Sequence, residues 1–276
     1  MFTMEAFLDA LTLEPVGTDR YRAPNIKTDY GMVFGGQLLA QATFAARVGQ
    51  EGKAVKTCHT VFARPASADE PLDITVDRMH AGRSLASSTV TISQHDQVIT
   101  RSLALLSAEE PDVIRHADSP AGRSRPEEVA DGLNVNGAWE SGIVGGVDVR
   151  DPELVGPPEL AVWARFAGAP DDPAVSQALL AFSTETFLIG TAMRPHAGVG
   201  QAQAHVTLST GVLTHTQTFH EPYPAGEWHL LEMRAGYTGH GRSFGRGDIF
   251  GLDGQLVGSW MQDAMIRARS GGAGKL

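Results

Sequence analysis

The sequence predicts an α+β protein in which one unit, a central helix wrapped by an antiparallel sheet, occurs twice along the chain. One observation is that a helical segment is followed by four strand-like runs in each half. A second is that short motifs recur 157–159 residues apart, in the pairs Phe62 and Phe219, Gly82 and Gly241, and Gln97 and Gln255. Such constant spacing indicates a tandem duplication. Joining the two sheets edge to edge would remove two exposed edges and enclose both helices.

Changes in composition set the expected domain boundaries. Residues 108–158 are rich in Glu, Asp, Pro and Gly and have no sustained hydrophobic period, which is typical of a connecting segment with partial structure. We therefore expect an N-terminal unit over residues 1–107, a linker over 108–158 and a C-terminal unit over 159–276.

The first unit begins with an amphipathic helix predicted over residues 4–11 and a short strand over 20–23. A helix over 36–48 consists of small and apolar residues on nearly every side, so we expect it to be enclosed, and Gly49 is placed to end it. Alternating runs separated by short turns predict four antiparallel strands over 54–64, 72–80, 84–94 and 98–107.

The second unit repeats this order. A strand is predicted over 159–166 and a helix over 171–193, in which Asp171 or Asp172 can cap the helix and Pro173 suits its first turn. Four further strands are predicted over 203–220, 228–237, 243–250 and 255–269.

Composition argues against several classes of protein. The net charge of −10 argues against a general nucleic-acid surface, because phosphate binding needs clustered Lys and Arg. The single cysteine, Cys58, cannot form an internal disulfide, and no Cys/His cluster has the spacing of a zinc site. No run of about 18 apolar residues could span a bilayer, and the N-terminus is acidic and amphipathic, so we expect a cytoplasmic protein without membrane insertion.

Glu185 interrupts the apolar stripe of the second central helix. Because an unpaired buried carboxylate is costly, such a residue has a partner, a raised pKa or a chemical task. The alternative is a slightly rolled helix that lets Glu185 reach a wet edge.

Polar side chains on two strands are candidates to meet Glu185. Two-residue alternation places Gln262 among apolar neighbours on one face of the last strand, and it places Thr210 and Thr214 together on one face of the 203–220 strand. A carboxylate, a hydroxyl and an amide in a dry pocket can activate water, orient it and stabilise an oxyanion. That set suits hydrolysis of an activated acyl group. An ordinary cross-strand hydrogen bond is the alternative for Gln262.

Six segments carry a resemblance to a known family. They are VFGGQLLAQA at 33–42, HTVFARP at 59–65, AGRS at 81–84, LLAFSTE at 179–185, FHEP at 219–222 and LVGSWMQDAMIR at 256–267. Together they resemble acyl-CoA thioesterase II, the TesB-like group of double hot-dog proteins, over nearly the whole chain apart from the linker. The resemblance implies a double hot-dog fold, with two central helices wrapped by a continuous antiparallel sheet. It also implies hydrolysis of acyl-CoA to free fatty acid and coenzyme A.

The resemblance also implies a catalytic set. In that family an aspartate on the second central helix, a threonine or serine on the next strand and a glutamine in the last strand activate water. The glutamine falls on Gln262 and the aspartate on Glu185, whose side chain is longer by one methylene. The hydroxyl position falls on Val212, which cannot hold a water. Thr214 and Thr210, about 7 Å along the strand on either side, are the candidates to replace it.

A further group of candidates concerns substrate binding. Free N–H groups at the Gly35–Gly36 turn can bind a thioester oxygen or a phosphate, and we expect His59 to lie near this turn. A packed or hydrogen-bonded histidine is the alternative for His59. Arg83 and Arg242 occupy matching hairpin turns and are candidates to contact the phosphates of coenzyme A, although a charged turn is commonly just solvated.

We therefore expect an acyl-CoA thioesterase that uses Glu185 as base or water-holder, Gln262 as amide donor and Thr214 or Thr210 as hydroxyl contributor, with no metal and no cofactor. The alternative is a catalytically weak acyl-CoA-binding protein, in which Val212 marks a lost site. A hot-dog hydratase or dehydratase would need a paired Asp and His, and neither predicted central helix holds a histidine. By analogy we expect a homo-oligomer, a dimer of double hot-dogs, with acyl-CoA as partner and no nucleic acid.

Overall fold

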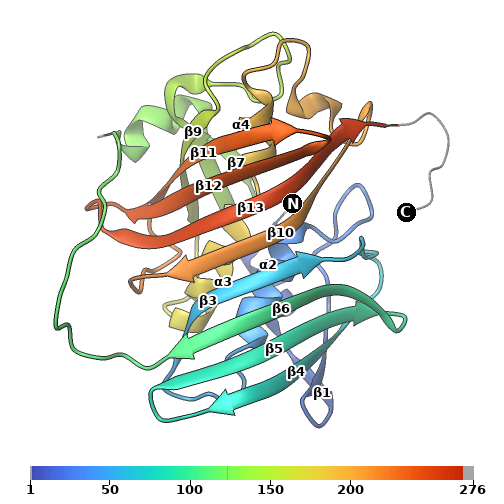
Figure 1. The fold of residues 1–276 in the computed structure, drawn as a ribbon, viewed down its shortest axis with the longest axis vertical. Helices are drawn as coiled ribbons and strands as arrows, with labels where there is room; N and C mark the ends of the chain where they lie inside the picture. The colour runs from blue at the N-terminus through green and yellow to red at the C-terminus, as the bar shows by residue number, and fades with distance from the viewer. Residues whose placement is uncertain (1, 123, 270–276) are drawn as a thin grey trace.

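In the computed structural model, which describes residues 2–122 and 124–269, a single antiparallel sheet wraps around two central helices (Figure 1). The strands of the N-terminal half are β1 (Glu14–Gly17), β2 (Arg20–Ala23), β3 (Ala54–Phe62), β4 (Leu72–Ala81), β5 (Leu85–Gln94) and β6 (Gln97–Ser107). Those of the C-terminal half are β7 (Asn134–Asn136), β8 (Trp139–Ile143), β9 (Glu159–Phe166), β10 (Leu208–Phe219), β11 (His229–Gly239), β12 (Arg242–Gly251) and β13 (Leu256–Ala268). Within the described ranges the order across the sheet is β1-β2-β4-β5-β6-β3-β10-β13-β12-β11-β9-β8-β7.

The two halves of the sheet join where β3 pairs with β10. On one side of this junction β6, β5 and β4 follow β3, and on the other β13, β12 and β11 follow β10 in the same sequence. Tight two-residue turns at His95–Asp96 and His240–Gly241 connect β5 to β6 and β11 to β12, and all four residues have the positive φ that such turns require. This topology confirms the predicted architecture of a continuous antiparallel sheet around two helices.

The central helices are α2 (Gly35–Ala45) and α3 (Pro173–Thr184), and both are enclosed as their composition predicts. They approach closely because Gly36 has no side chain: a Cβ there would lie 2.7 Å from the carbonyl oxygen of Phe182. Helix α1 (Met4–Leu11), capped by the Thr3 hydroxyl, buries Phe7, Ala10 and Leu11 against the same core.

An aromatic cluster centred on Phe182 fills the space between α1 and α3. Its rings, 4.6–6.4 Å apart in their centroids, belong to Phe2, Phe7, Phe34, Trp139, Phe166 and Phe182. Several pairs are edge-on, the arrangement that aromatic quadrupoles favour. The cluster therefore fixes the last turn of α3, which precedes Glu185.

The helix predicted over residues 171–193 is two helices. Helix α3 ends at Thr184, and α4 (Leu188–Met193) begins four residues later. The break has a packing cause: α3 lies against α2, whereas α4 lies against β11 and β12. The prediction of a single helix was wrong because the apolar stripe continues through the break.

The segment expected to be a linker contributes to the sheet. After β6 the chain runs along the outside of the molecule to the C-terminal half (Figure 1). There it forms the 3₁₀ helices η1 (Pro126–Gly132) and η2 (Val144–Gly146) and the strands β7 and β8, which extend the sheet beyond β9. The buried Trp139 of β8 ties this part of the segment to the core.

Candidate active site

The break between α3 and α4 places Glu185 at the beginning of α2. Glu185 is the C-cap residue of α3, directly after its last residue, Thr184. Its Oε1 lies 2.8 Å from the position that a Cβ on Gly35 would occupy. The absence of a side chain at Gly35 therefore makes room for the carboxylate, and the structure brings together two sequence-predicted residues, Glu185 and Gly35.

The two central helices differ at their N-termini. Helix α3 is capped by Asp172, whose Oδ1 accepts hydrogen bonds from the amides of Ala174 and Val175. Helix α2 begins after Phe34, which offers no side-chain cap. Because the first amides of a helix need acceptors and carry partial positive charge, the start of α2 is the one suited to bind an oxygen or an anion.

Burial changes the protonation behaviour around Glu185. The carboxyl is enclosed by protein, although the residue keeps a partial opening to solvent, and burial raises its pKa to about 8. Burial and then the charge of Glu185 raise the pKa of Tyr30 to about 12, so this tyrosine lies within electrostatic range of the carboxylate. Tyr30 is 54% exposed, so the site opens to solvent on this side.

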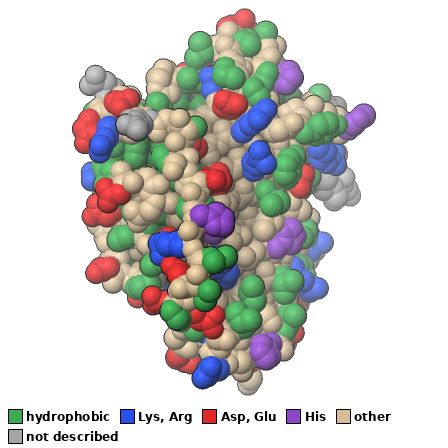
Figure 2. Space-filling model, turned by 60° about the vertical axis from the view of Figure 1, so that its left-hand side comes forward, with side chains coloured by type: hydrophobic (Ala, Val, Ile, Leu, Met, Phe, Trp, Pro, Cys, Tyr) green, Lys and Arg blue, Asp and Glu red, His purple; other side chains and the backbone are tan. Residues whose placement is uncertain are grey.

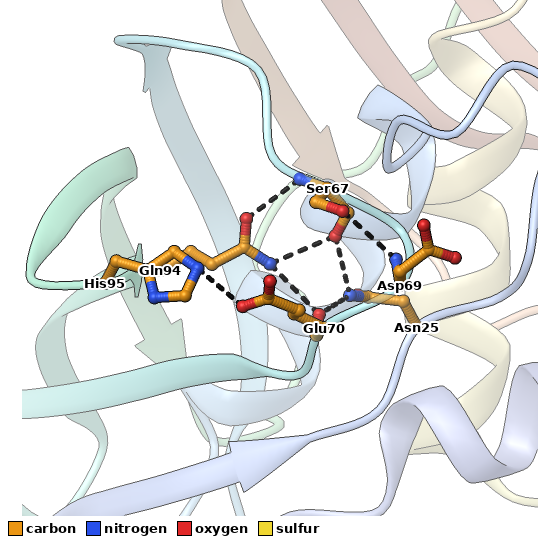
Figure 3. A network of polar contacts seen from close by, with 6 residues as sticks. All are labelled: Asn25, Ser67, Asp69, Glu70, Gln94 and His95. Carbon is orange, nitrogen blue, oxygen red and sulfur yellow. Dashed lines mark hydrogen bonds and ion pairs between the residues drawn. The ribbon is translucent and has the colours of Figure 1, made fainter.

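A polar network holds the segment that leads into α2 (Figure 3). The residues drawn are Asn25, Ser67, Asp69, Glu70, Gln94 and His95. Asn25 and Gln94 both donate side-chain N–H groups to the carbonyl oxygens of Ser67 and Glu70. In turn, Gln37 of α2 donates to Asn25 Oδ1 at 2.6 Å. The first turn of α2, and with it the glycine that faces Glu185, is thereby fixed to β5 and to the β3–β4 connection.

Gln262 lies on the inner face of the sheet and has no internal partner. It is 2% exposed, and within the described part of the chain neither its Oε1 nor its Nε2 makes a hydrogen bond. An unsatisfied buried amide costs about 1–3 kcal/mol, so such a group is found where a ligand or water completes it. The alternative of a cross-strand side-chain hydrogen bond for Gln262 is wrong.

Residues on either side of Glu185 contact the two strands that flank Gln262. Thr184 Oγ1 lies 3.0 Å from Nε2 of His215, which is directly opposite Gln262 on β10. The Leu188 side chain lies 2.5 Å from where a Cβ on Gly245 would be, and Gly245 is directly opposite Gln262 on β12. Glu185 and Gln262 are therefore on the same, inner side of the sheet.

A β-bulge separates the two threonines that alternation placed together. Val212 pairs with Ala264 and Thr214 with Asp263, so Leu213 is an extra residue that reverses the facing of the strand beyond it. Thr214 points to the outer face, where its hydroxyl donates to Asp263 Oδ2 at 3.1 Å. The prediction that it shares a face with Thr210 was wrong. Thr210 remains buried.

The bulge also explains which residues the sequence reasoning missed. It turns His215 inward, to a position that simple alternation assigns to the outer face. Thr184 and Thr186, which flank Glu185, both carry buried hydroxyls, and that of Thr186 has no hydrogen-bond partner within the described residues. Threonines beside a carboxylate in the sequence were a usable signal, whereas nothing in the local pattern marks the bulge.

His59 does not lie near the Gly35–Gly36 turn, and that prediction was wrong. Its side chain is on the exposed outer face of β3, where Nδ1 lies 2.7 Å from Thr216 Oγ1 of the neighbouring strand. The inner positions next to it on β3 are Cys58 and Thr60, both buried. The hydrogen-bonded alternative for His59 is the one that the structure supports.

Arg83 and Arg242 are exposed at the hairpin turns where the sequence places them. On the face shown in Figure 2, the described Lys and Arg side chains are interspersed with Asp and Glu and form no continuous basic area. Contact with the phosphates of a bound coenzyme A therefore stays a prediction for these two arginines.

Within 2–122 and 124–269, His, Cys, Asp and Glu side chains do not gather in groups of three or more that could hold a metal ion. None of the helices in these ranges has the length and apolar character needed to cross a membrane.

Comparison with protein families matches both halves of the chain. The family model described as the acyl-CoA thioesterase N-terminal domain matches residues 25–107. The one described as the acyl-CoA thioesterase C-terminal domain matches residues 112–266.

Individual relatives extend over almost the full length. Acyl-CoA thioesterase 2 of Haemophilus influenzae is 28% identical, over 93% of this chain and 95% of its own. Human acyl-coenzyme A thioesterase 8 is 26% identical, over 94% and 88%. The crystal structure of acyl-CoA thioesterase II TesB2 from Mycobacterium marinum superposes with a TM-score of 0.79 at 27% identity, covering 98% of this chain and 100% of that one. A hot dog fold protein from Alicyclobacillus acidocaldarius, 20% identical with a TM-score of 0.77 over 96% and 98%, is alike in fold. These likenesses confirm the double hot-dog fold.

Proposed function

We propose that this chain, which belongs to the TesB-like acyl-CoA thioesterase family of hydrolases, cleaves acyl-CoA with a water molecule held between the Glu185 carboxylate and the Gln262 carboxamide. One observation carries the assignment of residues. Gln262 has a buried amide without a partner among the described residues, on the same side of the sheet as a carboxylate whose pKa is raised by burial. A donor and a base of this kind are the two groups that hydrolysis of a thioester requires.

In the proposed reaction, Glu185 removes a proton from water as the water oxygen bonds to the thioester carbonyl carbon. The carbonyl oxygen becomes negative and accepts a hydrogen bond from Nε2 of Gln262, aided by the free amides at the start of α2. The carbon–sulfur bond then breaks, and the sulfur takes up the proton and leaves as the thiol of coenzyme A. The other product is the free fatty acid. No step in this scheme needs a metal or a redox cofactor.

Two buried hydroxyls are candidates for orienting the water, because Val212 occupies the position where the family pattern has a hydroxyl. Thr210 lies two residues from Val212 on the inner side of β10, and Thr186 lies beside Glu185. Replacing each threonine by valine distinguishes the two candidates, because kcat should fall only when the hydroxyl that orients the water is lost. Thr218→Val is the matched control, because Thr218 lies on the outer face of the same strand and bonds Thr57.

The substrate would lie with its acyl chain between the central helices and the sheet. Its coenzyme A moiety would lie across the surface within reach of Arg83 and Arg242. We further propose that the protein acts as a homo-oligomer.

A test of this function combines a panel of acyl-CoA thioesters with a dye that traps the released thiol. We expect turnover by the wild type and a loss of about 100-fold or more in kcat for Glu185→Gln and for Gln262→Leu, because each removes a group that acts on the transition state. Unchanged turnover in either folded variant would remove that residue from the mechanism.

The second candidate function is binding of acyl-CoA without turnover, which the valine at position 212 favours. The same panel decides between the two functions. Saturable binding of acyl-CoA by the wild type without release of thiol would establish this second function and reject hydrolysis.

A further inference from the structure

A cluster of three buried polar side chains connects the end of α3 to the sheet beside the site. Thr184 Oγ1 lies 3.0 Å from Nε2 of His215 and 3.2 Å from Oε1 of Gln217, both on β10. All three residues are at most 2% exposed. Thr184 immediately precedes Glu185, so these contacts anchor to the sheet the backbone that carries the proposed base.

Counting protons fixes the form of the imidazole. Thr184 Oγ1 also lies 2.8 Å from the carbonyl oxygen of Ala181. This oxygen and Oε1 of Gln217 are both acceptors. The threonine hydroxyl has one proton, and giving it to one of these two oxygens rather than to the ring leaves the fewest acceptors facing one another. Nε2 of His215 must then carry a hydrogen and donate to Thr184 Oγ1. Burial lowers the pKa of His215 to about 3, so the ring is neutral and Nδ1 has no hydrogen.

The same histidine stands at the centre of a row of inner-face residues that crosses the junction between the two halves. The row runs through Ser102 of β6, Thr60 of β3, His215 of β10 and Gln262 of β13, each directly opposite the next. Ser102 and Thr60 bond each other at 2.8 Å. On one side His215 is therefore next to the Thr60–Ser102 hydroxyl pair, whose members bond each other. On the other side it is next to Gln262, whose amide has no partner in the described part of the chain.

We propose that His215 is a positioning residue of the site, which through Thr184 sets the place of Glu185 relative to Gln262. The role rests on the proposed function, since it is the distance between base and amide that His215 fixes. The hydrogen bond to Thr184 keeps the end of α3 next to this row of inner-face residues. Because Nε2 of His215 bonds Thr184, this nitrogen does not engage the Gln262 amide, which stays available for the carbonyl oxygen of a substrate.

Substitutions at His215 distinguish positioning from simple support of the fold. Glutamine can place an amide N–H near the position of Nε2 and so donate to Thr184, whereas leucine cannot. We expect His215→Leu to lower kcat by about tenfold or more with little change in KM, because a displaced base misses a bound substrate. His215→Gln should keep most of the wild-type kcat.

A double substitution tests the route through Thr184. If His215 acts through this residue, His215→Leu combined with Thr184→Val should lower kcat no further than the larger single effect. His229→Gln is the matched control: His229 is also a fully buried strand histidine with a pKa lowered by burial, but it lies at the beginning of β11 and bonds the carbonyl of Glu227. Its kcat should equal that of the wild type. Additive losses would overturn the proposal.

The pKa of Glu185, followed by ¹³C NMR of its carboxyl carbon, gives a measurement that does not depend on turnover. Tyr30, from the segment before α2, is the titratable group whose pKa responds to the charge of Glu185, and α2 places the backbone of Gly35 against the carboxylate. In His215→Leu the released carboxyl gains water, so its pKa should fall from the wild-type value, and His215→Gln should restore it. An unchanged pKa in His215→Leu would overturn the proposal. Absence of turnover by the wild type would instead overturn the proposed function, and the titration would still decide the role of His215.

Discussion

At the scale of single residues, the site is built from groups that are costly in the free protein. Glu185 is a carboxyl with a raised pKa, and Gln262 is a buried amide without a partner within the described residues. Neither choice helps the fold, because a hydrophobic side chain at either position would avoid the desolvation cost. Both become useful when a water and a carbonyl oxygen occupy the space between them. The same costs lead to two predictions.

The first prediction concerns the dependence of turnover on pH. A general base acts in its deprotonated form, so kcat/KM should rise with pH and level off above about 8, the pKa to which burial raises Glu185. A pH series of kcat/KM for one good acyl-CoA substrate measures this. A profile that is already flat at pH 6 would show that the acting base is an ordinary carboxylate.

The second prediction concerns the stability of Glu185→Gln. Because the folded-state pKa is raised, the folded protein holds the carboxyl proton more tightly than the unfolded chain does. This contribution to stability is complete below the unfolded pKa, falls as pH rises from about 4.5 towards 8, and stays lost above that. Glutamine has no such proton to lose. At pH 8.5 the variant should be more stable than the wild type by about 1–3 kcal/mol, a gap that closes near pH 4.5 in denaturant titrations.

At the scale of elements, two glycines at the start of α2 separate activity from stability. A Cβ on Gly35 would meet the flexible end of the Glu185 side chain at 2.8 Å, whereas a Cβ on Gly36 would meet the rigid backbone oxygen of Phe182 at 2.7 Å. Gly35→Ala should therefore displace the carboxylate and lower kcat while changing the free energy of unfolding little. Gly36→Ala should push the central helices apart and cost about 1–3 kcal/mol.

Measuring kcat and urea unfolding for this matched pair tests the assignment. The two variants carry the same change at adjacent positions, so differences in helix propensity cannot explain a divergent result. If Gly35→Ala kept full activity, the carboxylate would not need its present place beside α2.

Elements also mark the limit of what the sequence allows one to predict. The repeated spacing predicts the paired units, and alternation in the last strand correctly places Gln262 inside, because both are regular patterns. The Leu213 bulge and the break after Thr184 are single irregularities, whose energies come from strand pairing and helix packing elsewhere in the molecule. The bulge exchanges the faces of the sheet on which Thr214 and His215 lie, and the helix break turns Glu185 towards α2. The types of residue in the site were therefore predictable from the sequence, whereas which of them lie together was not.

At the scale of the whole molecule, the duplication creates two related positions, of which one is suited to chemistry. We propose residues 1–107 and 159–276 as the duplicated units. Arg47 lies twelve residues after Gly35, the first residue of α2, as Glu185 lies twelve after Pro173, the first of α3. The second position thus has a guanidinium where the first has a carboxylate.

The second position is also closed at its helix. Asp172 caps α3, and its charge partly offsets the lowering that burial causes in the pKa of Arg47, so the two side chains interact electrostatically. Gln97 and Gln255 are a matching pair of the repeat, 158 residues apart. The same spacing matches Gln262 with Ala104, which has no amide to donate. The duplicated position therefore lacks the base, the donor and the free helix start.

Binding stoichiometry and a cap substitution test this asymmetry together. A non-hydrolysable acyl-CoA thioether should bind with one molecule per chain in isothermal titration calorimetry. Asp172→Ala should cost about 1 kcal/mol of stability through loss of the helix cap, yet leave that stoichiometry and kcat unchanged, because the closed position contributes no chemistry. Two molecules bound per chain of wild type would show instead that the position at Arg47 accepts substrate despite its reversed charge. The small loss of stability in Asp172→Ala sets how far its kcat should fall. A larger fall in kcat would point to the same conclusion.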